Sequence, residues 1–237
     1  MNAEPVETSG ASLVSDAIGV ITRHIRHHQL GPGDKLPSEA SLAKELSVSR
    51  SVVREAFRSL SAMRLINLSA GKRATVAQLD DGAMSLMIEH GLVTEQISVQ
   101  HIYDVRRTME MRTVTLASLR RTDVEAHSIV QHAAQMLAHI NDPEQVMEHD
   151  LAFHLEIAKA SRSPIFGMIV GAFQGVSRES WPIGWRSRTQ VAQRRAMIQT
   201  HIDIADAILT GDPHKANSLM SAHFDDSMRV LLDAGMV

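Results

Sequence analysis

The sequence of 237 residues contains no cysteine, and only 3% of its residues are aromatic. Without cysteine the chain has no disulfide framework, no thiolate zinc site and no cysteine nucleophile. No apolar run approaches the roughly 18–20 residues that are needed to cross a bilayer. Residues 1–10 carry Glu4 and Glu7 rather than a basic segment followed by an apolar one. We therefore expect no secretory signal, no membrane span and a cytoplasmic protein.

What the chain does contain favours helices. Hydrophobic residues make up 44% of it, which excludes general disorder, and 13 methionines are among them. A core of Leu, Ile, Ala and Met with few aromatic residues is typical of helices packed on helices. The length corresponds to one large domain or two modest ones. We therefore predict a mainly α protein.

The net charge of −3 hides an uneven distribution. Between Arg23 and Arg73 there are ten Lys or Arg and four Asp or Glu, a net charge of +6. From Asp81 to the end, 14 basic and 19 acidic residues give −5. Two domains with different functions are indicated, and nucleic acid is the natural partner of the basic one. The alternative is a solvated surface with a chance excess of arginine.

The basic third has the pattern of a winged helix-turn-helix. Apolar residues recur at helical spacing over residues 11–28, and Ser38 can cap a second, short helix. A third helix is predicted over residues 50–63, and residues 65–68 and 73–77 are predicted to form a β-hairpin, the wing. One side of the third helix is apolar. Its other side carries Ser49, Arg50, Ser51, Arg54 and Arg58.

The run LPSEASLAKELSVSRSVVREAFRSLSAMRLI, followed by GKRATVA, resembles the DNA-binding domain of the GntR family of bacterial transcription regulators. This resemblance implies that Arg50 and Arg54 contact operator DNA, with Ser49, Ser51 and the wing residue Lys72 beside them. Two positions depart from the family pattern. Ala40 stands where many members have an arginine that contacts DNA. Arg73 stands where many have a glycine in the wing, and we include it among the expected DNA contacts.

The acidic two thirds are predicted to be an antiparallel bundle of six helices. We expect a DNA-binding domain over residues 11–78, a linker over residues 79–97 with a short helix from Gly82, and the bundle over residues 98–235. Cap-then-proline starts at Asp142 and Asp212 mark two of the helices. The six helices are expected over residues 98–120, 121–140, 143–160, 164–180, 188–210 and 213–234. The segment from Trp181 to Trp185 is expected to be a loop.

Four ionisable residues fall on the apolar stripes of these helices. Asp150 and His154 are four residues apart on the third bundle helix, and His201 and His223 lie on the stripes of the last two. Each would cost several kcal/mol if it were buried without a partner. A divalent ion would satisfy all four, and nitrogen and oxygen ligands suit Zn²⁺, Ni²⁺ or Mn²⁺, of which we favour Zn²⁺. Alternatively, each histidine is bonded to a carbonyl in the core.

The segments HDLAFHLEIAKAS and HIDIADAILTGDPHKANSLMSAHF resemble the effector domain of the FadR subgroup of this family, the FCD domain. The resemblance implies that Asp150, His154, His201 and His223 bind a metal and that a small carboxylate effector joins it. It also implies that Arg106 faces the cavity. Arg106 falls on the stripe of its helix, which supports a role in holding the carboxylate. An ion pair with an acid of another bundle helix is the alternative.

The two resemblances together imply a homodimeric regulator, a repressor rather than an activator, that reads a palindromic operator and responds to a small organic acid. Two other classes use the same residues. One is a metal sensor, in which the ion itself is the signal. The other is a metallohydrolase fused to a DNA-binding domain, which needs a general base beside the metal. The sequence has no HExxH motif, and we expect no further acid on a core stripe near the ligands.

Overall fold

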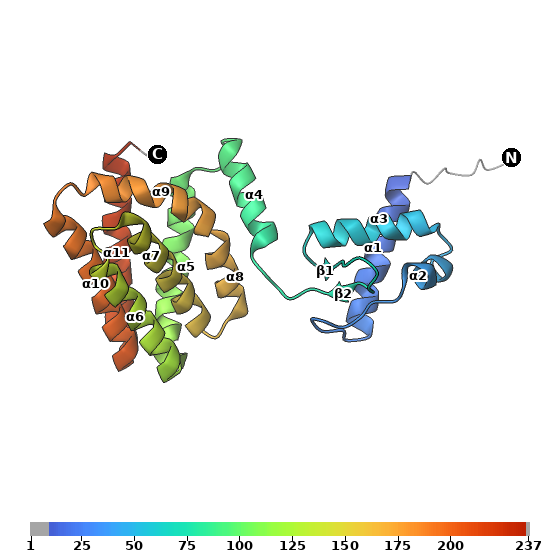
Figure 1. Cartoon of the computed structure of the whole chain (residues 1–237), viewed down its shortest axis with the longest axis horizontal. Helices are drawn as coiled ribbons and strands as arrows, with labels where there is room; N and C mark the ends of the chain where they lie inside the picture. The colour runs from blue at the N-terminus through green and yellow to red at the C-terminus, as the bar shows by residue number, and fades with distance from the viewer. Residues whose placement is uncertain (1–9, 236–237) are drawn as a thin grey trace. The chain divides into compact units, whose positions relative to one another are not determined.

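The computed structural model describes residues 10–235 and divides between Ala83 and Met84 into two compact units (Figure 1). Each unit has its own hydrophobic core. The expectation that no secretory signal is present concerns residues 1–10, of which residues 1–9 lie outside the described part of the chain. The mainly α fold predicted from the sequence is confirmed, with a single two-stranded sheet among the described residues.

The first unit is a three-helix domain with a small hairpin. It consists of α1 (Gly10–His27), α2 (Glu39–Glu45), α3 (Arg50–Ala62), β1 (Ile66–Asn67) and β2 (Thr75–Val76). The strands are antiparallel, with Ile66 paired to Val76, and they are shorter than the pattern predicts. Gly71 has φ of +69° in the turn between them, a conformation that side chains with a Cβ rarely adopt. The buried core includes Ile21, Leu36, Leu42, Val53, Phe57, Leu60 and Ile66.

The second unit consists of eight helices. They are α4 (Gly82–Val93), α5 (Val99–Arg120), α6 (Asp123–Ala138), α7 (Pro143–Ala160), α8 (Pro164–Ala172), α9 (Gln174–Ser187), α10 (Val191–Thr210) and α11 (Pro213–Asp233). The central helix α5 packs against α7, α10 and α11, and α6 packs against α7 and α10. The core therefore lies between α5, α7, α10 and α11, the helices that carry the predicted ligands and Arg106.

The predicted helix over residues 164–180 and the predicted loop after it are both wrong. The chain forms α8, breaks at Phe173 and continues as α9, so Trp181 and Trp185 lie inside a helix. Pro182 stands within that helix and provides no backbone N–H to it. Trp185 is nevertheless 4% exposed and belongs to the main core, so packing outweighs the local preference for a break.

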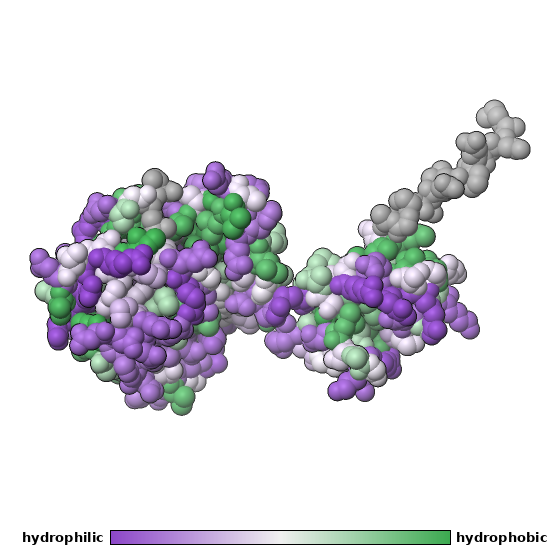
Figure 2. Space-filling model, turned by 45° about the horizontal axis from the view of Figure 1, so that its top comes forward, coloured by the Kyte–Doolittle hydropathy of each residue, from purple (hydrophilic) through white to green (hydrophobic). Residues whose placement is uncertain are grey.

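Polar residues cover most of the visible face of the α4–α11 unit, with small hydrophobic areas between them (Figure 2). Across residues 10–235, every helix is too short or too polar to cross a membrane.

Candidate metal centre and nucleic-acid interface

Helix α7 directs two ionisable side chains into the core of the second unit. Its start is fixed by Asp142, whose carboxylate accepts a hydrogen bond from the Gln145 amide at 3.2 Å. From there the helical repeat places Asp150 and His154 one turn apart on the inner face. They are 8% and 3% exposed, respectively. The sequence pattern thus located two buried polar groups correctly.

The structure brings the three predicted histidines together. His154 of α7, His201 of α10 and His223 of α11 are all buried, and their candidate ligand nitrogens lie within 4.8 Å of one another. The ring centroids are 4.6 Å apart for His201 and His223 and 5.1 Å apart for His154 and His223. Three nitrogen ligands from three helices thus converge on one point in the core.

The contact between His201 and Asp150 fits a metal better than a hydrogen bond. His201 Nε2 lies 2.8 Å from Asp150 Oδ1, but the direction is not that of a hydrogen bond, and Nε2 has no hydrogen-bond partner among the described residues. The other ring nitrogen, Nδ1, faces the Met197 carbonyl at 3.0 Å and donates to it as N–H. In the neutral ring, Nε2 then carries a lone pair that faces a carboxylate oxygen. A cation bound by both atoms would relieve this repulsion.

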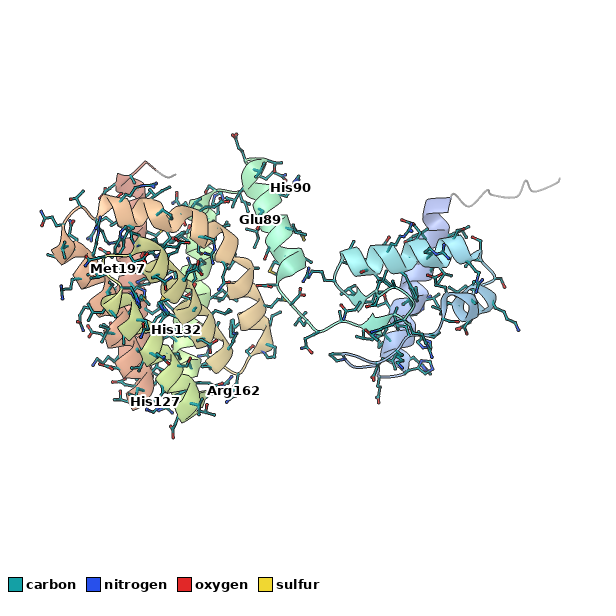
Figure 3. All side chains as sticks on the ribbon, in the orientation of Figure 1. Glu89, His90, His127, His132, Arg162 and Met197 are labelled. Carbon is teal, nitrogen blue, oxygen red and sulfur yellow. The ribbon has the colours of Figure 1, made fainter. Side chains whose placement is uncertain are left out.

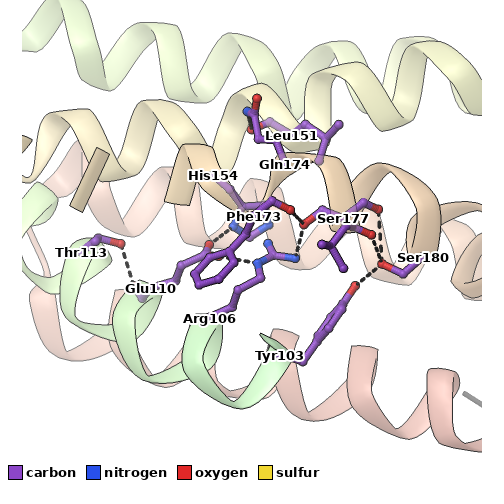
Figure 4. Close-up of polar contacts among 11 residues, drawn as sticks. Tyr103, Arg106, Glu110, Thr113, Leu151, His154, Phe173, Gln174, Ser177 and Ser180 are labelled. Atoms are coloured by element: carbon purple, nitrogen blue, oxygen red, sulfur yellow. Dashed lines mark hydrogen bonds and ion pairs between the residues drawn. The ribbon is translucent and has the colours of Figure 1, made fainter. Parts of the chain in front are cut away.

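A buried carboxylate that the sequence pattern does not predict supports His154. Glu110 of α5 is 1% exposed, and its Oε2 contacts His154 Nδ1 (Figure 4). Its other oxygen accepts a hydrogen bond from Arg106 Nε at 2.9 Å. A carboxylate on one imidazole nitrogen fixes the ring and leaves Nε2 free to bind a metal. The expectation that no further acid lies near the ligands is therefore wrong. The available signal was the spacing, because Glu110 is one turn after Arg106.

The protonation states in this core suit a cation. Burial raises the pKa of Glu110, but the charges of Arg106 and His154 and the hydrogen bonds with both residues together outweigh burial and lower this pKa to about 2. Burial also opposes ionisation of Asp150, yet attraction to His201 and to the other two imidazoles, when these rings are protonated, keeps the pKa of Asp150 below its ordinary value. Burial, followed by the charge of His201, lowers the pKa of His223 well below its ordinary value. The carboxylates are therefore ionised and His223 is neutral near pH 7, as metal coordination requires.

A cavity of about 50 Å³ adjoins these ligands. Asp150, His154 and His223 form part of its wall, and α9 forms another part. Trp181 and Trp185, whose rings stack at 5.1 Å, also line it. The volume corresponds to a few water-sized groups, so the cavity as it stands suits a small ligand.

Arg106 lines this cavity but already has protein partners. Its Nε bonds to Glu110 and its NH1 donates to Ser177 Oγ at 2.9 Å (Figure 4). The guanidinium also lies 5.2 Å from the Tyr103 ring centroid and 5.4 Å from that of Phe224. Arg106 and Glu110 belong to the same helix, α5. The alternative expected from the sequence, an ion pair with an acid of another bundle helix, is therefore wrong. The pair fixes Arg106 at the cavity wall, where further N–H donors remain for a ligand.

In the first unit, α3 has the features of a recognition helix. Ser49 caps it, because its Oγ accepts from the Val52 amide at 3.4 Å, and Ser49 and Ser51 are linked through their hydroxyl groups at 2.7 Å. Arg50 and Ser51 are exposed at the start of the helix. A groove of about 650 Å³ runs between α3 and the wing. Its lining includes Arg50, Arg54, Arg58, Lys72 and Arg73.

Two of these arginines have contacts that sequence patterns do not reveal. Arg54 NH2 lies 3.2 Å from Glu39 Oε2, and its side chain remains 56% exposed. Arg73 donates from Nε and NH2 to the Leu36 carbonyl at 2.9 and 2.5 Å, which ties the wing to the segment before α2. Arg73 therefore has a structural role, whereas the Arg50 and Lys72 side chains form no hydrogen bond or ion pair with residues 10–235.

Comparison with known proteins gives the same division of the chain. The family described as "Bacterial regulatory proteins, gntR family" matches residues 13–76, and the FCD domain matches residues 101–226. The chain is 29% identical to the HTH-type transcriptional regulator LutR of Bacillus subtilis over 87% of this chain and 95% of that protein. It is 27% identical to the galactonate operon transcriptional repressor of Escherichia coli, over 88% and 92% of the two chains.

A solved structure extends the match to the fold. The structure of a GntR protein of Streptococcus agalactiae is 22% identical, with a TM-score of 0.65 over 91% of this chain and 99% of that one. The likeness covers both the winged helix-turn-helix and the helical unit. This chain belongs to the GntR family of bacterial regulatory proteins and carries an FCD domain after its DNA-binding domain, the architecture of the FadR subgroup.

Proposed function

We propose that this protein is a cytoplasmic, homodimeric transcriptional repressor that binds a palindromic operator and is released by a small carboxylic acid. Similarity supports the class, because the galactonate operon relative and the NanR proteins of Salmonella, 28% identical over 85% of this chain, are named repressors. Galactonate is itself a carboxylic acid. The observation that carries the proposal is the convergence of three buried imidazoles, with Asp150 in contact with His201, beside a cavity that Arg106 also lines.

The four residues would hold one divalent ion, with Zn²⁺ preferred over Ni²⁺ or Mn²⁺. Asp150, His154, His201 and His223 provide one oxygen and three nitrogens, a donor set without sulfur that suits these metals. The unpartnered His201 Nε2 facing Asp150 supports the assignment, as does Glu110 on the far nitrogen of His154. When bound, the ion would supply a positive centre for a carboxylate oxygen of the effector.

Arg106 would hold the same carboxylate from the opposite side. Its guanidinium is planar, buried and fixed by Glu110 and Ser177, so little conformational entropy is lost when it binds. Burial lowers the pKa of Arg106, but the charge and hydrogen bond of Glu110, with smaller contributions from Tyr103 and Asp150, together raise it above its ordinary value, so the side chain stays charged. Charge-assisted hydrogen bonds of this kind typically contribute about 1.5–3 kcal/mol.

In the first unit, α3 and the wing would contact DNA. Arg50 and Arg54 would reach base edges or phosphates in the major groove, with Ser49 and Ser51 beside them, and Lys72 would contact the backbone. The effector would bind more tightly to one arrangement of the two units than to another. This difference in the free energy of effector binding sets how much the operator affinity changes.

A gel-shift titration tests the proposal. The DNA is a fragment selected by the purified protein from a random library, and the protein is titrated after metal removal, with Zn²⁺ alone, and with Zn²⁺ plus a series of small organic acids. We expect DNA binding with Zn²⁺ and release by one or more acids. Release by Zn²⁺ alone would instead identify a metal sensor. If neither metal nor acid altered DNA binding, the regulatory part of the proposal would be wrong.

An enzymatic role has less support. A metallohydrolase needs a free general base beside its metal. Glu110 and Asp150 are the two buried acids among the described residues, and both oxygens of Glu110 are engaged, one by His154 and one by Arg106. With its pKa at about 2, it is also a weak base near pH 7. A binding function therefore fits the site better than hydrolysis.

A further inference from the structure

One side of the cavity is formed by a stripe of residues along α9. The stripe includes Ser177, Trp181, Gly184 and Arg188, which recur every three or four residues and all line the cavity. Arg188 is the residue that ends the helix, and it is 8% exposed. The cavity wall therefore holds a second arginine, which the sequence analysis did not single out.

The two arginines bond to different positions along this stripe. Arg106 NH1 donates to Ser177 Oγ, whereas Arg188 NH1 donates to the Gly184 carbonyl at 3.0 Å. Ser177 and Gly184 are seven residues apart on one helix, and a rise of 1.5 Å per residue separates these two positions by about 10 Å. Hydrogen bonds to a carboxylate are only about 2.7–2.9 Å long, so this spacing suits two acidic groups better than one.

Arg188 also lies where the cavity meets the outside. It and Met197 of α10, labelled in Figure 3, line both the cavity and a more open groove of about 450 Å³. Arg188 NH2 donates to Asp226 Oδ2 at 2.6 Å, and the Asp226 side chain is 39% exposed in that groove. A guanidinium has five N–H donors, and Arg188 uses two of them in these bonds with described residues. The cavity can therefore hold a longer ligand if its far end reaches the mouth.

Arg106 and Arg188 are the two cationic side chains of the cavity lining, and each is paired with one carboxylate of the protein. Glu110 and Asp226 form these pairs from outside the lining, and each guanidinium keeps further N–H donors for a ligand. A monocarboxylate would leave Arg188 without an anionic partner from the ligand, whereas a second acidic group would supply one.

We propose that the effector is a small acid with two anionic groups, and that Arg188 binds the second of them at the cavity mouth. The first group lies between the histidine cluster and Arg106, so this inference rests on the proposed function and extends it to a class of ligand. Arg188 is then a residue that determines specificity between monocarboxylates and dicarboxylates.

The alternative role for Arg188 is purely structural. It ties the end of α9 to α11 through Gly184 and Asp226, and its loss could deform the whole cavity. Deformation of the cavity would lower the affinity for monocarboxylates and dicarboxylates alike. Loss of a partner for the second acidic group would lower the affinity for dicarboxylates only, so the ratio of the two affinities distinguishes the two roles.

Calorimetry on the metal-loaded full-length protein tests whether Arg188 binds a second acidic group. Each titration compares a monocarboxylate with a dicarboxylate of equal chain length, butanoate with succinate and pentanoate with glutarate. The variant is Arg188→Gln. The matched control is Arg229→Gln, which removes the same charge from a side chain that also pairs with Asp226 but lines only the outer groove. In the wild type and the control, we expect one dicarboxylate to bind at least tenfold tighter than its monocarboxylate.

In Arg188→Gln we expect this preference to disappear while monocarboxylate affinity and metal content stay unchanged. Arg188→Lys, which keeps the charge, should retain part of the preference. A wild type without any preference, or an Arg188→Gln variant that weakens both acids equally, would overturn the assignment and leave the proposed carboxylate effector intact. If none of the acids bound to the wild type, the proposal of a carboxylate effector would fail with it.

Discussion

Glu110 on α5 contacts the Nδ1 atom of His154 on α7, and this contact determines which nitrogen of the ring faces the other two histidines. Glu110→Gln should weaken metal affinity by about 10- to 100-fold, the usual effect of removing such a partner. The amide is neutral, and it cannot accept from both His154 and Arg106 as the carboxylate does. Competition with a fluorescent zinc chelator measures the affinity.

Glu156→Gln is the matched control for this change. Glu156 is on α7 as well, but it pairs with Lys159 at 2.9 Å and lies outside the histidine cluster. We expect its metal affinity to equal that of the wild type. Equal affinities in the Glu110 and Glu156 variants would mean that the carboxylate does not support the metal centre.

The histidines should hold about one divalent ion per chain. His201→Ala and His223→Ala should each lower the metal content and the melting temperature, because an ion that binds only the folded state stabilises it. His214→Ala, on the exposed side of α11, is the control and should change neither quantity. Elemental analysis after dialysis measures the content. Metal content equal to that of the wild type in both His201→Ala and His223→Ala would rule out the proposed site.

Operator binding without effector should survive loss of the metal ligands. The DNA-binding unit has its own core, which contains no residue of the helical unit. In a gel shift, His201→Ala should therefore bind the operator within a few-fold of wild type. A large loss of DNA binding would indicate that the metal is needed to hold the DNA-binding arrangement itself.

Changes at the start of α3 should affect sequence preference as well as affinity. Arg50→Ala and Arg54→Ala should each cost about 1–3 kcal/mol at the operator. Lys72→Ala should weaken binding evenly across sequences and give a shallower salt dependence. Arg23→Ala is the control, because it removes the same charge from an exposed residue of α1 that does not line the groove between α3 and the wing. If Arg50→Ala and Arg54→Ala bound the operator as the control does, α3 would not be the recognition helix.

Helical periodicity and capping residues were enough to predict most of this fold. The start of α7 at Asp142 and Pro143, and the stripes that turn His154 and His223 inward, depend on local chemistry that the sequence displays directly. The segment from Trp181 to Trp185 shows the limit. Its proline and glycine favour a break locally, yet burial of Trp185 in the core keeps it helical.

The composition of the site was harder to predict than its ligands. Histidines on an apolar stripe are conspicuous, whereas Glu110 one turn after Arg106 resembles an ordinary surface ion pair on a helix. Only the packing of α5 against α7 shows that this pair is buried and that His154 meets it. The position of Arg188 at the cavity was equally hard to predict from the sequence, because it depends on how far α9 extends.

The last prediction concerns Arg106, which has two roles that one substitution would remove together. Arg106→Ala takes away the proposed partner of the effector carboxylate, and it also leaves the buried Glu110 with one partner fewer. We therefore expect effector affinity to fall by roughly tenfold to a hundredfold and the melting temperature to fall as well, because breaking a buried ion pair is destabilising.

A second variant separates the two roles. Arg106→Lys keeps a charge beside Glu110 and should recover most of the melting temperature. It should restore effector affinity only in part, since an ammonium group cannot hold both carboxylate oxygens in one plane. Calorimetry with the effector and an operator-release titration measure the outcome, with DNA affinity in the absence of effector as the reference. Undiminished effector affinity in Arg106→Ala would assign Arg106 to the Glu110 ion pair alone, and the carboxylate would then need another partner in the cavity.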